Sequence, residues 1–265
     1  MVKSKALRKK EMKYEERVPD ALFREEDGQY LGRPADFNDR IISRRVNIVA
    51  NTEGFVQKDA HLLDIGCGNG ASMFLLCDKV SQCMGIDIND DHEEELKNYA
   101  AQHGIKNVDF EIVDVVAEEP KKQYDRIISF EVIEHLSAED GVAYYHKALK
   151  DDGIMAISVP NKWWIFETHG AKLPLLPWNR VPFFSWLPKP IHEKYANARI
   201  YTKRRIIKLL EKHNFSVEET HYVTAPMDVL PDGKFKKWVI RNFFDKDTTR
   251  NPCKAVSIIV IAKKK

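Results

Sequence analysis

The sequence predicts an α/β fold with a doubly wound, mainly parallel sheet, and three observations support this. An apolar strand pattern at 61–65 runs into a glycine turn at 66–70, and an apolar helical stretch follows. Strand and helix patterns then alternate as far as residue 160, which is typical of parallel sheets with right-handed crossovers. Acidic residues follow several of these strands, at the edge where open sheets of this kind bind ligands.

Composition narrows the class of protein. The chain has 265 residues, of which 43% are hydrophobic, and its 42 basic and 40 acidic residues nearly balance. The near balance of charge excludes a strongly basic nucleic-acid-binding protein. A local basic patch is still compatible with this charge balance. The four cysteines form no C-x-x-C pair, so neither a disulfide framework nor a zinc site is expected. The first residues lack the apolar core of a secretory signal, and we expect a cytoplasmic protein.

The chain divides into an extension and one domain. Residues 1–35 are predicted to form an N-terminal extension, with a basic tail and then a partly ordered loop at 21–35. Apolar residues recur at helical spacing between 36 and 51, so a helix opens the domain at 36–265.

The glycine turn is the most informative stretch. It reads Asp64-x-Gly66-x-Gly68-x-Gly70, with Cys67 inside it, and a strand and a helix on either side. Such a turn exposes backbone N–H groups and lets a nucleotide approach the main chain. Its third glycine comes one position earlier than in the dinucleotide fingerprint G-x-G-x-x-G. The alternative is an ordinary glycine turn without a ligand.

The next strands supply further polar groups. The strand at 81–88 ends near Asp87, which lies 21 positions after Gly66 and is therefore placed to accept hydrogen bonds from ribose hydroxyls. The alternative role for Asp87 is to cap the helix at 91–103. A strand at 108–113 leads to Asp114, where a simple turn residue is also common.

Glu131, Glu134 and His135 follow the strand at 124–130. On a helix these positions share one face, where two carboxylates and an imidazole can hold a divalent cation. The alternative is structural: Glu131 orients a cofactor and the other two make local hydrogen bonds. Ser137 is then predicted to cap a helix that runs to residue 149, before a turn at 151–153 and a strand at 154–159.

Residues 161–200 break the alternation and contain four of the five tryptophans among five prolines. We interpret this segment as an aromatic lid over a substrate, extended by an irregular segment at 224–254. Plain packing on the core is one alternative, and a weak membrane-surface contact is another, because Trp beside Lys and Arg suits that interface. Between the two insertions, Thr202 is predicted to cap a helix at 203–213, and strands are predicted at 216–223 and 255–262.

Together the glycine turn, Asp87, Asp114 and the 131–135 run resemble class I S-adenosylmethionine (SAM)-dependent methyltransferases over 36–161, and loosely over 202–223. The resemblance implies a Rossmann-like seven-stranded sheet of order 3-2-1-4-5-7-6 with an antiparallel last strand. It also implies SAM as cofactor, with the adenine near Asp114 and Val115. The cofactor-binding residues would be Asp64, Gly66, Cys67, Gly68, Gly70, Asp87, Ile88, Asp114, Val115, Phe130 and Glu131.

The E-x-x-E-H run is similar to the metal-binding run of ubiquinone-pathway O-methyltransferases and of small-RNA 3′-terminal 2′-O-methyltransferases. That similarity implies Mg²⁺ at Glu131, Glu134 and His135. It also suggests His135 and His192 as catalytic residues, with His169 as the competitor of His192.

The expected activity is therefore SAM-dependent O-methylation of a small-molecule, glycan or lipid-linked hydroxyl, and N-methylation stays open. An RNA 2′-O-methyltransferase is the first alternative, which would gather the basic residues of 203–205 and 234–241 on the cleft rim. A SAM-binding module without turnover is the second.

Overall fold

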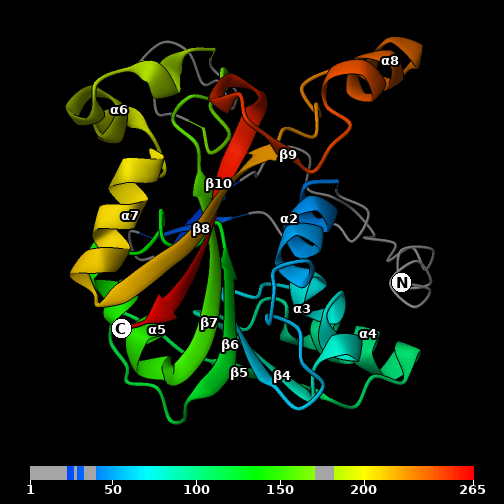
Figure 1. Ribbon diagram of the computed structural model, residues 1–265, viewed down its shortest axis with the longest axis vertical. Helices are drawn as coiled ribbons and strands as arrows, with labels where there is room; N and C mark the ends of the chain where they lie inside the picture. The colour runs from blue at the N-terminus through cyan, green and yellow to red at the C-terminus, as the bar shows by residue number, and fades with distance from the viewer. Residues whose placement is uncertain (1–22, 27–28, 33–39, 171–181) are drawn as a thin grey trace.

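The computed structural model describes residues 23–26, 29–32, 40–170 and 182–265. Its centre is one eight-stranded sheet of order β5-β4-β3-β6-β7-β10-β8-β9 (Figure 1). The strands are β3 (His61–Ile65), β4 (Gln82–Asp87), β5 (Val108–Ile112), β6 (Tyr124–Phe130), β7 (Leu149–Pro160), β8 (Phe215–Thr224), β9 (Thr248–Thr249) and β10 (Ala255–Lys264).

The predicted strand order is confirmed. Strands β5, β4, β3, β6 and β7 pair in parallel, and β10 lies antiparallel between β7 and β8. The predicted number of strands was one too low, because the short strand β9 pairs with the edge of β8. A two-residue strand carries no alternation of apolar and polar residues by which a sequence could reveal it.

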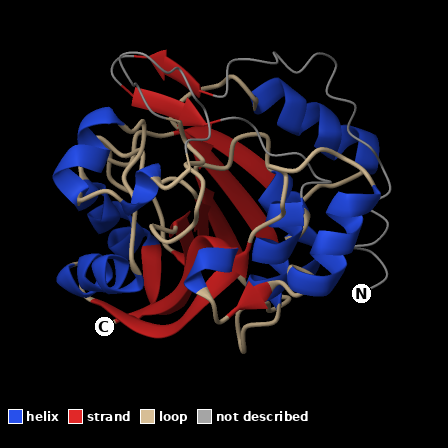
Figure 2. Ribbon diagram, turned by 90° about the horizontal axis from the view of Figure 1, so that it is seen from above, coloured by secondary structure: helices blue, strands red, loops and turns tan. Residues whose placement is uncertain are grey.

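Helices cover both faces of the sheet (Figure 2). One hydrophobic cluster lies between the sheet and the helices α2, α3 and α4, and a second lies between the sheet and α5 and α7. The helices are α2 (Arg40–Ala50), α3 (Ala71–Phe74), α4 (Glu93–His103), α5 (Val142–Ala148), α6 (Lys189–Tyr195), α7 (Lys203–Lys212) and α8 (Lys234–Phe243). Short 3₁₀ turns occupy Cys77–Lys79, Glu139–Gly141, Phe184–Trp186 and Pro252–Lys254.

The caps of two helices were predicted with different outcomes. Thr202 caps α7 as expected, since its hydroxyl accepts a hydrogen bond from the Arg205 N–H at 3.2 Å. Ser137 does not cap the following helix. A 3₁₀ turn starts after Ala138 instead, and α5 begins only at Val142.

Three further expectations are corrected. The loop expected at 21–35 contains an antiparallel hairpin of β1 (Phe23–Glu26) and β2 (Gln29–Gly32). The turn expected at 151–153 lies inside β7, where Leu149 and Ile154 face Tyr124 and Arg126 and the residues between them bulge. The segment 224–254, expected to be irregular, contains α8.

The division at residue 35 stays a prediction, because 33–39 lie outside the described residues. Among the described residues, no helix is long and apolar enough to cross a bilayer.

Candidate functional site

The glycine turn joins β3 to α3 at the carboxyl edge of the sheet. Gly66, Gly68 and Gly70 all have positive φ angles, of 71°, 50° and 78°, which other L-residues adopt only at a cost. The N–H groups of Gly66 and Cys67 both donate to the Ile86 carbonyl, at 2.8 and 3.1 Å. The turn is thereby fixed to the end of β4.

Gly66 and Gly68 face different surroundings. A Cβ atom on Gly66 would lie 2.3 Å from Cγ2 of Val132, so only glycine fits between the turn and the 131–135 segment. A Cβ atom on Gly68 would meet no atom of the described residues within 4 Å. The turn is thus closely packed below Gly66 and open above Gly68, which is the side from which a ligand can reach the main chain.

Asp87 is bound directly to this turn. Its Oδ2 accepts a hydrogen bond from the Gly68 N–H at 2.8 Å, and its Oδ1 accepts one from the Ile88 N–H, also at 2.8 Å. These two bonds fix the carboxylate at the end of β4, beside the open side of the turn. The alternative role as a helix cap is wrong, because the residue that precedes α4 is His92.

Asp64 lies below the turn and is buried. Its Oδ2 has no hydrogen-bond partner among the described residues. Burial, together with the charge of Asp87, raises the pKa of Asp64 well above its usual value. Burial also raises the pKa of the Cys67 thiol, which therefore stays neutral and serves for packing.

Asp114 forms a local turn. Its Oδ1 accepts a hydrogen bond from the Val116 N–H at 2.8 Å, as the simpler alternative predicted. The same loop is tied to β4, because the Val113 N–H donates to the Asp87 carbonyl at 2.8 Å. Asp114 and Asp87 are therefore neighbours along the strand ends.

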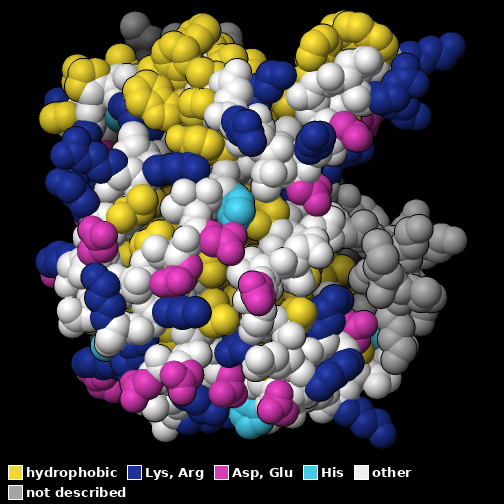
Figure 3. All heavy atoms as spheres, in the orientation of Figure 1, with side chains coloured by type: hydrophobic (Ala, Val, Ile, Leu, Met, Phe, Trp, Pro, Cys, Tyr) yellow, Lys and Arg dark blue, Asp and Glu magenta, His cyan; other side chains and the backbone are white. Residues whose placement is uncertain are grey.

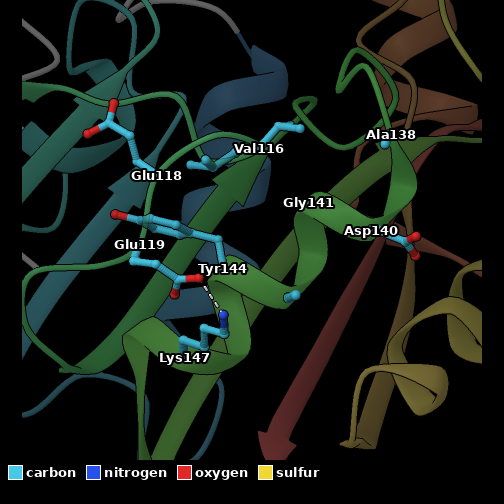
Figure 4. Close-up of a pocket in the computed structure, with 10 residues that line it drawn as sticks. Val116, Glu118, Glu119, Ala138, Asp140, Gly141, Tyr144 and Lys147 are labelled. Carbon is cyan, nitrogen blue, oxygen red and sulfur yellow. Dashed lines mark hydrogen bonds and ion pairs between the residues drawn. The ribbon is translucent and has the colours of Figure 1, made fainter.

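A cavity of about 150 Å³ opens beside this loop (Figure 4). Val115, Val116 and Tyr144 line it, together with an ion pair in which Lys147 contacts Glu119 at 2.6 Å. Of the residues predicted to bind cofactor, only Val115 lines this cavity. The glycine turn and the 131–135 segment lie elsewhere along the edge.

The segment 131–135 is not helical, so the shared helix face predicted for its acids is wrong. Glu131 has a φ of 61°, and its N–H donates to the Ser158 carbonyl at 3.0 Å. Its carboxylate accepts a hydrogen bond from the Ser158 hydroxyl at 2.6 Å and pairs with Arg45 at 2.9 Å. Glu131 is thereby held against β7, and Phe130 before it packs on the core.

A ligand-like cluster nevertheless forms from Glu134, His135 and His169, whose donor atoms all lie within 4.8 Å of one another. Glu134 is buried, and neither of its carboxylate oxygens has a hydrogen-bond partner among the described residues. Nε2 of His169 lies 3.4 Å from Oε1 of Glu134 and 3.7 Å from Oε2 of Glu131. The third member of the predicted trio is thus His169, and Glu131 lies beside the cluster.

Burial and charge shift the pKa of each member. Desolvation, with the charge of Glu131, raises the pKa of Glu134 to about 7. Desolvation, together with the positive charges of His169 and Arg199, lowers the pKa of His135 to about 3. Burial alone would lower the pKa of His169, but the nearby carboxylates outweigh it and raise that pKa.

His192 lies in α6, fully buried, and is not one of the three clustered residues. Its Nε2 lies 2.8 Å from Oε2 of Glu167. The other carboxylate oxygen of Glu167, Oε1, accepts a hydrogen bond from the backbone N–H of His169 at 3.0 Å. Glu167 therefore links His192 to His169. Glu167 is not among the residues predicted from the sequence, and no spacing in the sequence marks it.

Known proteins resemble the chain in sequence and in fold. Residues 56–199 match the methyltransferase domain family. A ubiquinone biosynthesis O-methyltransferase of Pelagibacter ubique (strain HTCC1062) is 29% identical over 168 residues, which are 61% of this chain and 64% of that protein. The alignment thus covers less than two thirds of this relative's length.

Two solved structures show the fold. A SAM-dependent methyltransferase from Clostridium acetobutylicum ATCC 824 superposes with a TM-score of 0.56 at 14% identity, over 87% of this chain and 92% of that one. Coclaurine N-methyltransferase bound to N-methylheliamine and SAH superposes with a TM-score of 0.56 at 16% identity, over 86% of this chain and 73% of that one. From the family match and this fold together, the chain belongs to the methyltransferase domain family, among the class I SAM-dependent methyltransferases.

Proposed function

We propose that the protein transfers the methyl group of SAM to a hydroxyl oxygen of a small acceptor. The observation that carries this proposal is the junction of the glycine turn with Asp87, which leaves the side above Gly68 open. Relatives named as O-methyltransferases support oxygen as the acceptor atom. A small molecule, a glycan or a lipid-linked compound would each supply such a hydroxyl.

The cofactor is proposed to lie along the carboxyl edge. Its methionine end would rest over the glycine turn and its ribose hydroxyls would donate to Asp87, whose orientation is already fixed by two backbone N–H groups. The adenine would then reach Asp114 and Val115, which the bond between the Val113 N–H and the Asp87 carbonyl holds close to Asp87. The buried Oδ2 of Asp64 offers a further acceptor below the turn.

We also propose that Glu134, His135 and His169 hold a divalent cation. Their chemistry fits one, because the buried Glu134 carboxylate, whose oxygens accept no hydrogen bond from the described residues, lies beside two imidazoles. Two nitrogen donors favour a transition metal such as Mn²⁺ or Zn²⁺ over the Mg²⁺ expected from the sequence. A cation bound there would act as a Lewis acid that weakens the acceptor's O–H bond.

The residues of the chain then have separate tasks. A sulfonium methyl group is already reactive, so the protein mainly aligns the nucleophile and excludes water. His135 is neutral at pH 7 and, with a pKa of about 3, is a weak base, which suits a ligand better than a proton acceptor. His192 is proposed to position His169 through Glu167 rather than to touch the acceptor.

Contacts at 203–205 weaken the RNA alternative. Nζ of Lys203 donates to the Thr220 carbonyl and lies over the Tyr222 ring, and Arg205 pairs with Glu139 and Glu193. These two cations are engaged within the protein and do not form a free rim for phosphates.

The deciding experiment has two arms. Titration calorimetry with SAM should show binding to the wild-type protein and a large loss for Asp87→Ala. Methyl-labelled SAM incubated with cell extract, then separated into lipid, glycan, RNA and protein pools, should label a small-molecule, glycan or lipid pool, and more strongly with Mn²⁺ than with chelator. Label confined to RNA would favour the alternative, and SAM binding without any transfer would identify a non-catalytic module.

A further inference from the structure

Helix α8 exposes an aromatic surface. The helix packs inward through Ile240, with Val239 and Phe244 beside it, onto the buried ring of Trp164. On its outer side Phe235 is 65% exposed and Trp238 is 48% exposed. We call Phe235, Trp238 and Phe243 the α8 patch, because the ring of Trp238 lies 6.2 Å from that of Phe235 and 5.6 Å from that of Phe243.

The charges of α8 are all positive. The helix carries Lys234, Lys236, Lys237 and Arg241 and no acidic residue. Lys236 pairs with Asp232 at 2.8 Å. Within the described part of the chain, the other three basic side chains form no ion pair. Figure 3 shows Lys and Arg side chains beside the hydrophobic ones at this corner of the molecule.

A second aromatic surface, the lid patch, consists of Trp163, Phe183, Trp186 and Ile191. Each of these side chains is between 39% and 53% exposed. The ring of Trp186 lies 6.5 Å from that of Trp163 and 5.1 Å from that of Phe183. The three rings therefore form a continuous exposed apolar surface, of the kind that marks an interaction site, and Ile191 lies in α6, which packs beside the turn at Phe184–Trp186.

The two patches share one end of the molecule. Trp163, in the lid patch, is followed directly by Trp164, which supports α8, so consecutive residues anchor both. This pair lies just beyond the carboxyl end of β7, the same edge that bears the glycine turn. Helices α6 and α8 project at this end in Figure 1, and Figure 3 shows hydrophobic side chains gathered over both, with a hollow between.

We propose that the α8 patch and the lid patch together bind the surface of an anionic phospholipid bilayer. Aromatic side chains beside free Lys and Arg are the combination that lies in the interface of such a membrane. The cations of α8 that pair with no described residue complement negative headgroups. Two patches separated by a hollow suit a fluid surface, because a folded protein partner would have to fill the hollow to contact both.

Vesicle co-sedimentation of the full chain tests the proposal. The wild-type protein should bind vesicles of phosphatidylcholine with phosphatidylglycerol, bind pure phosphatidylcholine much more weakly, and dissociate as salt is raised. Lys234→Gln and Lys237→Gln should each lower the partition coefficient on anionic vesicles by about fivefold, since each removes one charge. Phe235→Ser with Trp238→Ser should lower it on the order of tenfold, through lost apolar contact.

Matched controls carry the same substitutions elsewhere. Lys106→Gln removes an exposed cation and Ile112→Ser removes an exposed apolar side chain, which is 52% exposed, and neither residue is in the two patches. Both controls should bind as the wild-type protein does. Phe183→Ser with Ile191→Ser should weaken binding as the α8 pair does, because the proposal requires both patches.

Each outcome decides the proposal. Equal binding of patch and control variants would overturn it, as would wild-type protein that stays unbound on anionic vesicles. If the protein self-associates in sedimentation velocity without lipid, and the double variant Phe235→Ser, Trp238→Ser does not, the surface would be assigned to a second copy instead.

The proposal does not depend on methyl transfer. Titration with SAM and urea unfolding of the same variants should match the wild type, which separates a loss of lipid binding from a damaged cofactor site or fold.

Discussion

Gly66 offers a quantitative test of the site, because the structure gives two separate costs for a side chain there. Gly66→Ala places a residue with a Cβ at a φ of 71°, which costs about 1–2 kcal/mol. It also brings that Cβ to 2.3 Å from Val132, far inside ordinary contact, and overpacking of this kind costs about 1–3 kcal/mol more. The expected loss in free energy of unfolding is therefore about 2–5 kcal/mol.

A double-mutant cycle separates the two costs. Val132→Ala removes the two closest atoms and leaves only the Cβ of residue 132, which would lie 3.3 Å from the new methyl group, so Gly66→Ala in that background should cost little more than the backbone term. In urea unfolding, the double variant should then be about 1–3 kcal/mol more stable than the sum of the two single-variant losses implies. A coupling energy of zero would refute the close contact between the turn and residue 132, and an unchanged stability of Gly66→Ala would refute the left-handed turn as well.

Gly68→Ala is the matched comparison. This residue also has a positive φ, but within the part of the chain that the structure describes its Cβ would meet no atom within 4 Å. Its stability should fall by only about 1–2 kcal/mol. Its affinity for SAM should fall at least tenfold by calorimetry, because the methyl group would occupy the side proposed for the cofactor. Full affinity in Gly68→Ala would place the cofactor elsewhere.

Four further predictions concern Asp87, Glu134 and Arg44. Asp87→Ala should weaken SAM binding by about 10- to 100-fold in calorimetry, since a charge-assisted hydrogen bond is lost. Because the pKa values of Glu134 and His169 are both raised, affinity for Mn²⁺ should fall by about tenfold or more per pH unit below 7, and Glu134→Gln should make this slope shallower. Without metal the raised pKa of Glu134 contributes a decline in stability as pH rises from about 4.5 through 7, which urea unfolding isolates as the pH-dependent difference between the wild type and Glu134→Gln. Arg44→Met should destabilise the protein by about 3 kcal/mol or more in urea, because buried Arg44 donates to the carbonyls of Thr224, Ala225 and Phe244.

The sheet was predictable because its inner strands have clear patterns. The apolar run at 61–65 ends at a glycine and the run at 124–130 ends at an acid, and both strands have the predicted bounds. Helix α8 escaped prediction for physical reasons. It follows Gly233 without a capping side chain and has no acid in its first turn. Its apolar side chains gather on one side of the helix, but of these only Ile240 is buried, while Phe235 and Trp238 are exposed.

The site was predictable only where its residues are close in sequence. The glycine turn and Asp87 meet as expected, because neighbouring parallel strands place their ends together. The group at 131–135 was wrongly assumed to be helical. The left-handed backbone of Glu131 turns its carboxylate towards Ser158 and Arg45, and distant His169 takes its place. Contacts between segments more than thirty residues apart leave no periodic trace in a sequence.

The position of β10 has a consequence for how the chain is made. Ribosomes synthesise β7 and β8 first, yet β10 lies between them and pairs with both. Until residues 255–264 emerge, the growing chain carries two unpaired strand edges that are able to bind each other wrongly or to recruit another chain. Nascent chains arrested before residue 255 should therefore be cut readily by protease between β7 and β8, while longer ones resist.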